Sequence, residues 1–316
     1  MKTPDSATSP GGPLQGHTPG GLAATGIAGG LAALARPSRG FAMLALDQRE
    51  ALRVMFAEHS TGPVSDERLT DFKLRATAVL SPYASAVLVD RQFALDRVVA
   101  ERAVAPGCAL IAAADRFAAD ERELVADTEI DDEVVPDRVR AQGVAALKLL
   151  VIWRPDGDPG RRAAMVTDFV RRCRAANLVS IIEPVSRAPR DGREWDWDDG
   201  VLAAARELGS LGADLYKAEV PRHGAGPEPE IRRRCAILTA TISSPWVVLS
   251  SGVARDDFPR AVTLACREGA SGFLAGRAVW RGVIGATDVG TALRRDALPR
   301  LRYLAGLVDQ NLASGR

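Results

Sequence analysis

The sequence predicts an α/β protein folded as a single (β/α)₈ TIM barrel. Eight short runs rich in Val, Ile, Leu and Ala alternate with longer segments of helical period. The runs are continuously apolar rather than alternating, which is typical of strands buried on both faces of a parallel sheet. Eight such units within about 270 residues match a closed barrel with an outer ring of helices.

The predicted strands and helices follow one another in order along the chain. The strands are expected at 41–47, 85–90, 108–114, 146–153, 179–185, 213–220, 246–252 and 271–278. Helices are expected at 49–58, 66–80, 160–176, 198–210, 228–242 and 256–268, with a helical C-terminal stretch. A doubly wound open sheet is the competing architecture. It usually has a glycine-rich phosphate loop after its first strand, but ALDQREA stands there instead.

The N-terminal segment differs in composition from the rest of the chain. Residues 1–20 are rich in Gly, Pro, Ser and Thr, and we expect a disordered tail there, with the barrel domain over 21–316. Residues 21–35 lack the charged start and continuous apolar core of a signal peptide. No segment approaches the roughly 20 apolar residues that a membrane span needs. We therefore expect a cytoplasmic protein.

Charge and cysteine content exclude several classes of function. The net charge is +1 and the basic residues are scattered, which argues against a nucleic-acid groove or a membrane-binding face. The four cysteines lie far apart and the chain has only three histidines. A zinc site or a disulfide framework is therefore not expected. The cysteines should be reduced thiols, and neither metal nor cofactor is expected.

Lysine is the most informative residue type in this chain. Lys and Arg total 41, yet only Lys2, Lys73, Lys148 and Lys217 are lysine. Arginine stays charged in proteins, whereas a lysine amine can lose its proton. Lys148 in ALKLLVIW and Lys217 in ADLYKAEV lie within apolar strands, where burial and a neighbouring cation lower an amine's pKa. A neutral amine forms a Schiff base with a ketone, so either lysine is a candidate nucleophile.

Each buried lysine also has a structural interpretation. Lys217 could pair with Glu219, and Lys148 with Glu183. Glu183 could be a charge partner for a lysine, or it could move protons during catalysis, as a partly buried glutamate at a strand end can. These two roles are compatible.

The carboxyl ends of the other strands supply candidate substrate-binding residues, because barrel chemistry gathers at that end. Asp47, Gln48 and Arg49 end the first strand; Asp47 could orient substrate hydroxyls, pair with a lysine or cap the following helix. SSG at 250–252 and AGRA at 275–278 end the last two strands. Backbone N–H groups in such turns, together with Arg277, are suited to binding a phosphate.

The strand motifs resemble a known enzyme family. The motifs are GFAMLALDQREALRVMF, LTDFK, LSPYASAVLVD, ALKLLVIWR, LVSIIEPV, ELGSLGADLYKAEVP, PWVVLSSGV, FPRAV and GASGFLAGRAVW. Together they resemble the class I aldolase family of tagatose-1,6-bisphosphate aldolase, and most of all its 6-deoxy-6-sulfofructose-1-phosphate aldolases of sulfoglycolysis. The resemblance extends from about residue 40 to about residue 310.

The resemblance implies a function and roles for residues. It implies metal-free retro-aldol cleavage of a sugar phosphate to dihydroxyacetone phosphate, with 3-sulfolactaldehyde as the second product in the sulfosugar branch, by a homo-oligomer (a dimer or tetramer). Lys217 corresponds to the Schiff-base lysine, with Lys148 and Glu183 as the assisting lysine and acid/base. Asp47 and Gln48 correspond to the substrate-binding pair. The phosphate-binding turns correspond to Ser251, Gly252, Gly276 and Arg277.

The substrate branch is left open by the motifs. Trp153 and Arg154 after ALKLLVI, and the form FLAGRAVW, favour the sulfosugar branch over tagatose or fructose bisphosphate. The sulfonate should need few cations because it is a monoanion; its candidate ligands are Arg49, Arg53, Arg91 and Arg154. RHG at 222–224 departs from the family pattern. A sugar-phosphate sensor without turnover is the non-enzymatic alternative.

Overall fold

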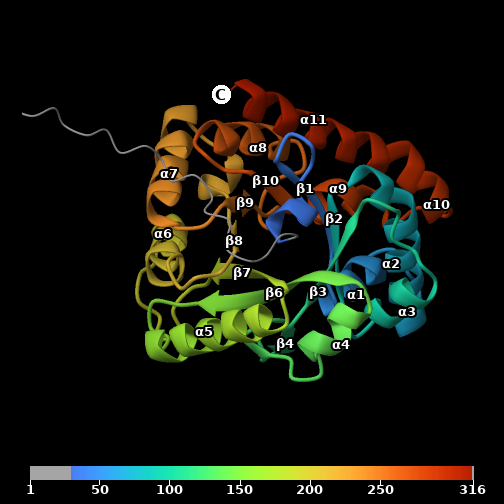
Figure 1. Ribbon diagram of the computed structural model, residues 1–316, viewed down its shortest axis with the longest axis horizontal. Helices are drawn as coiled ribbons and strands as arrows, with labels where there is room; N and C mark the ends of the chain where they lie inside the picture. The colour runs from blue at the N-terminus through green and yellow to red at the C-terminus, as the bar shows by residue number, and fades with distance from the viewer. Residues whose placement is uncertain (1–29, 315–316) are drawn as a thin grey trace, which may run out of the picture.

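The computed structural model describes residues 30–314. The predicted disordered tail over 1–20 lies outside these residues. Eight parallel strands close into a barrel in the order β1-β10-β9-β8-β7-β6-β3-β2, and Figure 1 shows helices arranged around the strands. The predicted (β/α)₈ barrel is therefore confirmed.

The barrel strands fall on the eight predicted apolar runs. They are β1 (Phe41–Leu46), β2 (Ala86–Asp90), β3 (Ala109–Ala113), β6 (Val144–Trp153), β7 (Val179–Ser186), β8 (Leu215–Ala218), β9 (Trp246–Val248) and β10 (Gly272–Ala275). The last three strands are shorter than predicted. In β9, the residues from Leu249 to Gly252 leave the strand and form the turn that follows it.

The helices cover the outside of the barrel. They are α1 (Glu50–Ala57), α2 (Asp66–Leu80), α3 (Leu95–Ala100), α4 (Pro136–Ala141), α5 (Pro159–Ala175), α6 (Trp197–Leu208), α7 (Glu228–Thr241), α8 (Phe258–Arg267), α9 (Arg277–Trp280), α10 (Val289–Ala292) and α11 (Leu298–Ser314). The six helices predicted between strands are all present, whereas the short α3 and α4 were not predicted.

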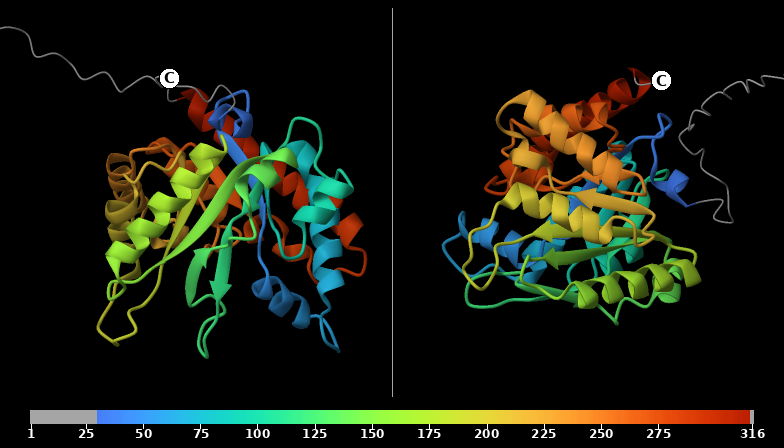
Figure 2. Two further views of the ribbon diagram at one scale, coloured as in Figure 1. Left: turned by 60° about the horizontal axis from the view of Figure 1, so that its bottom comes forward. Right: turned by 90° about the vertical axis from the view of Figure 1, so that its left-hand side faces the viewer.

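A hairpin interrupts the barrel pattern between β3 and β6. Its strands β4 (Asp115–Ala118) and β5 (Asp127–Ile130) pair antiparallel. Figure 2 (left) shows it projecting from the same end of the barrel as α1, the end to which the parallel strands run. The prediction missed this hairpin because its strands are short and partly exposed, so they lack the continuous apolar pattern of the barrel strands.

The inside of the barrel changes from apolar to charged along the strands. Side chains such as Met43, Ile181 and Leu215 fill the interior, and the 3₁₀ helix η1 (Leu31–Leu34) contributes the buried Leu34 to the same cluster. A separate, larger apolar cluster packs the helices on the sheet. Two residues after Ile181 and Leu215, the inward positions hold Glu183 and Lys217. The alternation of strand side chains therefore places charged groups at the carboxyl end.

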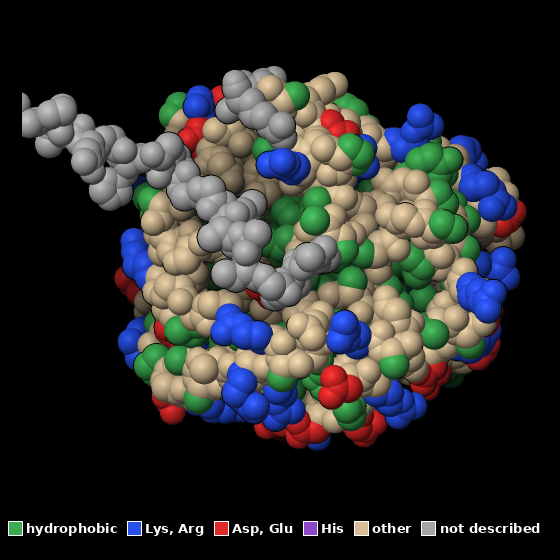
Figure 3. Space-filling view, viewed as in Figure 1, with side chains coloured by type: hydrophobic (Ala, Val, Ile, Leu, Met, Phe, Trp, Pro, Cys, Tyr) green, Lys and Arg blue, Asp and Glu red, His purple; other side chains and the backbone are tan. Residues whose placement is uncertain are grey.

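The surface and the cysteines agree with the sequence. On the face seen in Figure 3, Lys and Arg side chains are interspersed with Asp and Glu around the edge. Among residues 30–314, no helix is long and apolar enough to cross a membrane. The four cysteines are free thiols, as predicted, and burial raises the pKa of Cys108 to about 12.

Barrel closure depends on a glycine at the start of β10. Gly272 has φ +135°, and an added Cβ would lie 2.0 Å from the carbonyl oxygen of Phe41 on β1. We expect Gly272→Ala to lower the free energy of unfolding by at least about 1–3 kcal/mol, through strain at a special backbone conformation. Urea denaturation followed by circular dichroism measures it.

The matched control is Gly306→Ala within α11, where an added Cβ meets nothing within 4 Å. This variant should be as stable as the parent protein or more stable by up to about 1 kcal/mol, because alanine favours a helix. Equal effects of the two substitutions would contradict the proposed closure constraint.

Candidate active site

A chain of buried ion pairs crosses the carboxyl end of the barrel. Lys148 Nζ lies 2.6 Å from Asp47, 2.8 Å from Asp115 and 3.1 Å from Glu183. The other oxygen of Glu183 lies 2.9 Å from Lys217 Nζ. Lys148 is fully buried and Lys217 is 3% exposed. We call these five residues and Arg49, which contacts Asp115 at 2.8 Å, the ion network.

The strand register explains why the two lysines share one glutamate. β7 lies between β6 and β8 in the barrel. Lys148 stands on β6 and Lys217 on β8, with Glu183 on the strand between them. Both lysines are buried within the barrel strands, as the sequence predicts. The predicted pairing of Lys148 with Glu183 is also present, but Lys217 contacts Glu183 instead of Glu219.

Carboxylates control the charge of Lys148. Burial alone would lower its pKa, but Asp115, Asp47 and Glu183 together raise it well above the ordinary value. The expected repulsion between the two lysines therefore does not make Lys148 a neutral amine. Asp47 responds in the opposite direction: burial would raise its pKa, yet Lys148 and Lys217 hold it well below its usual range.

Asp47 and Asp115 have roles that sequence reasoning did not resolve. Asp47 does not cap α1, whose N-cap is Arg49 without a side-chain cap hydrogen bond, so the capping alternative was wrong. Asp115 directly follows the apolar run predicted as the third strand, at 108–114. In the structure its carboxylate also accepts a hydrogen bond from the backbone N–H of Leu150, which fixes the hairpin to β6.

A cavity of about 550 Å³ opens above the ion network. Six predicted site residues line it, namely Asp47, Gln48, Arg49, Glu183, Ser251 and Arg277. Lys148, Lys217, Gly252 and Gly276 do not line it themselves. Glu183 lines the cavity and contacts both lysines. The buried Oε1 of Gln48 has no hydrogen-bond partner among the described residues, so it is available to a substrate hydroxyl.

Two turns and one arginine form the side of the cavity near β9 and β10. The Arg277 guanidinium donates a 2.5 Å hydrogen bond to Ser251 Oγ. Gly252 has φ +76°, and Gly276 lies so close to β1 that an added Cβ would be 2.5 Å from the Ala45 carbonyl. Burial, followed by the nearby Arg281, lowers the pKa of Arg277. The predicted phosphate-binding residues are thus brought together.

The RHG segment beside Lys217 has an unusual backbone. Arg222 and His223 both have positive φ values, 58° and 50°. The His223 ring stacks on Trp197 at 3.8 Å between centroids. The same ring packs against Gly252, where an added Cβ would lie 2.5 Å from His223 Nδ1. The departure from the family pattern therefore packs against the candidate phosphate turn.

The arginines proposed for sulfonate binding are mostly held by carboxylates. Arg49 contacts Asp115, and Arg91 contacts Asp131 at 3.1 Å. Arg53 does not line the cavity; it lies 2.6 Å from Asp66.

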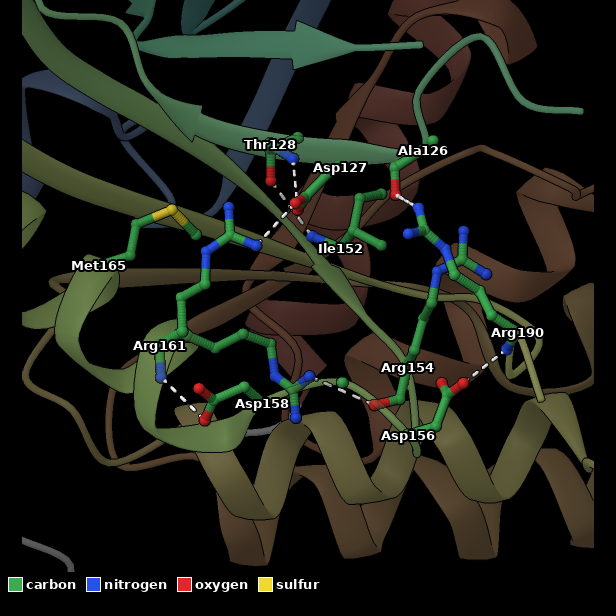
Figure 4. A pocket seen from close by; sticks show the side chains of 12 residues that line it. Ala126, Asp127, Thr128, Ile152, Arg154, Asp156, Asp158, Arg161, Met165 and Arg190 are labelled. Carbon is green, nitrogen blue, oxygen red and sulfur yellow. Dashed lines mark hydrogen bonds and ion pairs between the residues drawn. The ribbon is translucent and has the colours of Figure 1, made fainter. Parts of the chain in front are cut away.

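Arg154 likewise does not line the cavity; it belongs to a separate side pocket of about 180 Å³. Figure 4 shows this pocket, with Arg154 and Arg190 extending alongside each other toward Ala126.

A further buried lysine pair lies beside the site. Lys73 of α2 is fully buried and forms an ion pair with the equally buried Asp90. Asp90 ends β2 at the carboxyl end of the barrel, but it does not line the cavity. Among residues 30–314, no group of three or more His, Cys, Asp or Glu side chains is arranged to hold a metal ion.

Comparison with known proteins identifies the class of this barrel. Residues 41–282 match the model of the DeoC/LacD family aldolases. The chain therefore belongs to the DeoC/LacD aldolase family, and it is an aldolase, a lyase of carbohydrate metabolism.

Its relatives include enzymes named tagatose 1,6-diphosphate aldolase. The enzyme from Listeria monocytogenes serotype 4a (strain HCC23) is 25% identical over 276 residues, covering 79% of this chain and 80% of the relative. Tagatose 1,6-diphosphate aldolase 1 from Streptococcus pyogenes serotype M3 (strain MGAS315) is 26% identical over 265 residues, covering 76% and 81%.

Solved structures share the fold at lower identity. An archaeal fructose 1,6-bisphosphate aldolase has a TM-score of 0.60 at 18% identity, covering 88% of this chain and 96% of that one. Fructose-bisphosphate aldolase from Plasmodium falciparum has a TM-score of 0.66 at 14% identity, covering 90% and 94%.

The ion network predicts a large cost for removing its central cation. Lys148→Met removes the ion-pair partner of Asp47 and leaves three buried carboxylates with only Arg49 and Lys217 as cations. We therefore expect a loss of about 3–5 kcal/mol in the free energy of unfolding. Arg116→Met breaks a pair in which Arg116 is 68% and Glu129 52% exposed, and it should cost about 1 kcal/mol or less. Urea midpoints measured with unchanged m-values test this. Equal midpoints for the two variants would contradict the central position of Lys148.

Glu219 predicts a pH dependence of stability. Burial raises its pKa from 4.5 to about 8. Between these two values the folded chain holds a proton that the unfolded chain releases, so Glu219 makes the protein less stable as pH rises.

Glu219→Gln should therefore gain stability relative to the parent between pH 4.5 and 8, by at most about 1.4 kcal/mol per pH unit. The difference should be constant above pH 8. Thermal or urea unfolding at several pH values measures it, and parallel curves for the two proteins would show that Glu219 titrates normally.

Proposed function

We propose that this aldolase cleaves 6-deoxy-6-sulfofructose 1-phosphate to dihydroxyacetone phosphate and 3-sulfolactaldehyde, through a Schiff base at Lys217. The observation that carries the Schiff-base assignment is the unequal environment of the two lysines. Lys148 contacts three carboxylates, whereas Lys217 contacts only Glu183 among the described residues. An amine must lose its proton before it attacks a carbonyl.

Lys148 is suited to the assisting role rather than to the attack. Three carboxylates raise its pKa well above the ordinary value, so its proton is held. As a cation beside Asp47 it holds the pKa of that carboxyl low. Lys217, by contrast, is held by a single carboxylate that is also positioned to accept its proton.

Glu183 supplies the proton transfers in this proposal. It accepts a proton from Lys217, whose amine then attacks C2 of the ketose. It returns the proton to the carbinolamine hydroxyl, which leaves as water when the iminium forms. The C3–C4 bond then breaks and its electrons move to the iminium as an enamine. The C4 hydroxyl gives its proton to Glu183, which is ionised again at this stage, and the aldehyde forms. Protonation at C3 and hydrolysis release dihydroxyacetone phosphate and the amine.

Binding groups surround this reaction on two sides. The turns at Gly252 and Gly276, with Ser251 and Arg277, provide backbone N–H groups and a cation for the C1 phosphate. Asp47 and Gln48 face the cavity and are proposed to bind substrate hydroxyls.

The second candidate substrate is a tagatose or fructose 1,6-bisphosphate. It is favoured by the names of the relatives, which are tagatose 1,6-diphosphate aldolases. The sulfosugar is favoured by the form of the motifs ALKLLVIWR and FLAGRAVW. A sensor without turnover has no need for the intact Lys217–Glu183 pair. We also propose a cytoplasmic homo-oligomer that acts without a cofactor.

Borohydride trapping tests the nucleophile. Incubation with dihydroxyacetone phosphate and borohydride, followed by peptide mass spectrometry, should label Lys217. Lys73, which is as deeply buried, should remain unlabelled and serves as the internal control. Lys217→Ala should abolish cleavage and leave binding of dihydroxyacetone phosphate largely intact. A label on Lys148, or no label, would show the assignment to be wrong.

A further inference from the structure

We infer that Arg187 binds a second anionic group of the substrate, at the end distal to the C1 phosphate. The inference rests on the proposed function, because it assumes that the C1 phosphate lies at Arg277. Arg187 was not among the residues suggested by the sequence. It directly follows β7, and its backbone N–H donates to the Trp153 carbonyl at 2.9 Å, which fixes its position on the cavity wall.

The cavity arginines divide into paired and unpaired cations. Five arginines line the cavity, namely Arg49, Arg91, Arg116, Arg187 and Arg277. The first three form ion pairs with protein carboxylates. Arg49 pairs with Asp115 at 2.8 Å, and Arg91 with Asp131 and Glu133 at 3.1 and 2.8 Å. Arg116 pairs with Glu129 at 2.5 Å. These three arginines hold the hairpin and its surroundings, so their charge is already balanced.

Arg187 and Arg277 are the two cavity arginines that remain. Within the described chain, Arg277 makes no ion pair at 4.0 Å or less, and Arg187 only reaches Glu123, at 4.0 Å. One Arg187 nitrogen donates to the Ser186 carbonyl at 3.1 Å. The charge of Arg187 also contributes, after burial and Arg281, to the lowered pKa of Arg277. Two arginines with no carboxylate closer than 4.0 Å among the described residues therefore line one cavity, which suits a ligand with an anion at each end.

Glu123 is the group that would oppose an anion at Arg187. It lines the cavity, but its carboxylate is ion-paired with Arg154, which approaches from the side pocket. Arg154 is thus a positioning residue: it neutralises Glu123 and leaves the charge of Arg187 available. The other nearby acid, Glu219, has a pKa of about 8 because it is buried, so it is mostly uncharged at neutral pH.

This arrangement favours a monoanion over a dianion. A sulfonate has one negative charge, whereas a phosphate ester has about 1.5 to 2 at neutral pH. The distal end offers one free guanidinium beside a carboxylate. A single bidentate contact with Arg187 balances the charge of a sulfonate. It leaves part of the charge of a phosphate without a counter-charge, because the nearby Arg154 is already paired with Glu123.

Substrates that differ only at the distal end test the inference. The substrates are 6-deoxy-6-sulfofructose 1-phosphate, fructose 1,6-bisphosphate and fructose 1-phosphate, which has no distal anion. Arg187→Met should lower kcat/KM for the two distally charged substrates by roughly 10- to 100-fold, the usual effect of a lost hydrogen bond to a charged group. The value for fructose 1-phosphate should change less than about threefold. Arg187→Lys should recover part of the loss because it keeps the charge.

The matched control is Arg193→Met. Arg193 lies on the same loop after β7, is exposed and pairs with Asp191 at 2.5 Å, and does not line the cavity. It should leave all three values unchanged. Glu123→Gln should raise the rate on fructose 1,6-bisphosphate relative to the sulfonated substrate. An equal loss on all three substrates in Arg187→Met, or no loss on the charged ones, would overturn the inference.

A binding measurement separates this inference from the proposed catalysis. Calorimetry with 2,3-dihydroxypropane-1-sulfonate, an analogue of the distal half, needs no turnover. Its affinity should fall roughly 10-fold or more in Arg187→Met and stay unchanged in Arg193→Met. Equal affinities would refute the role of Arg187 even if Lys217 is trapped by borohydride. Absence of trapping with the predicted affinity loss would refute the Schiff-base mechanism alone.

Discussion

The site depends on the balance of charge in the ion network. Three cations, Arg49, Lys148 and Lys217, face three carboxylates, Asp47, Asp115 and Glu183, all at least nine-tenths buried. Taking each charge out of water costs several kcal/mol, and mutual attraction offsets that cost only when every partner is present. The apolar interior below fixes the strands that carry them. The barrel therefore holds a layer of charge whose geometry is set by the sheet rather than by flexible loops.

The two lysines of the ion network differ in the number of carboxylates that contact them. Lys148 has three acidic contacts and Lys217 has one. The carboxylates raise the pKa of Lys148 well above its ordinary value, whereas Lys217 has a single carboxylate partner, Glu183, at 2.9 Å. The same division applies to the arginines of the cavity, where protein carboxylates neutralise some and leave Arg187 and Arg277 for a ligand. A cation that no protein carboxylate neutralises can attract an anionic group of a substrate.

The sequence predicts the strands, which follow from local hydrophobic patterns, but not the ion pairs, which depend on residues distant in the chain. Continuous apolar runs located the eight strands, and their order placed Lys148 and Lys217 in the interior. The β4–β5 hairpin escaped notice because its strands are short and half-exposed. The sequence does not show which arginines are paired with carboxylates, because such partners can be distant in the chain. The partner of Arg154, for example, lies in the hairpin loop, 31 positions away. Arg187 follows its strand in a loop with other arginines, where nothing in the local sequence distinguishes it.

The β4–β5 hairpin contributes one residue to the buried ion network and another to the wall of the cavity. Its base holds Asp115, a member of the ion network, and the loop between its strands carries Glu123 at the cavity wall. The base is constrained by buried charge, whereas residues 119–126 are mostly exposed. Under the proposed role of Arg187, substitutions in this loop would change the charge beside the distal anion and leave Asp115 and the ion network in place. The loop would then be the part of the chain in which substrate preference changes independently of the catalytic residues.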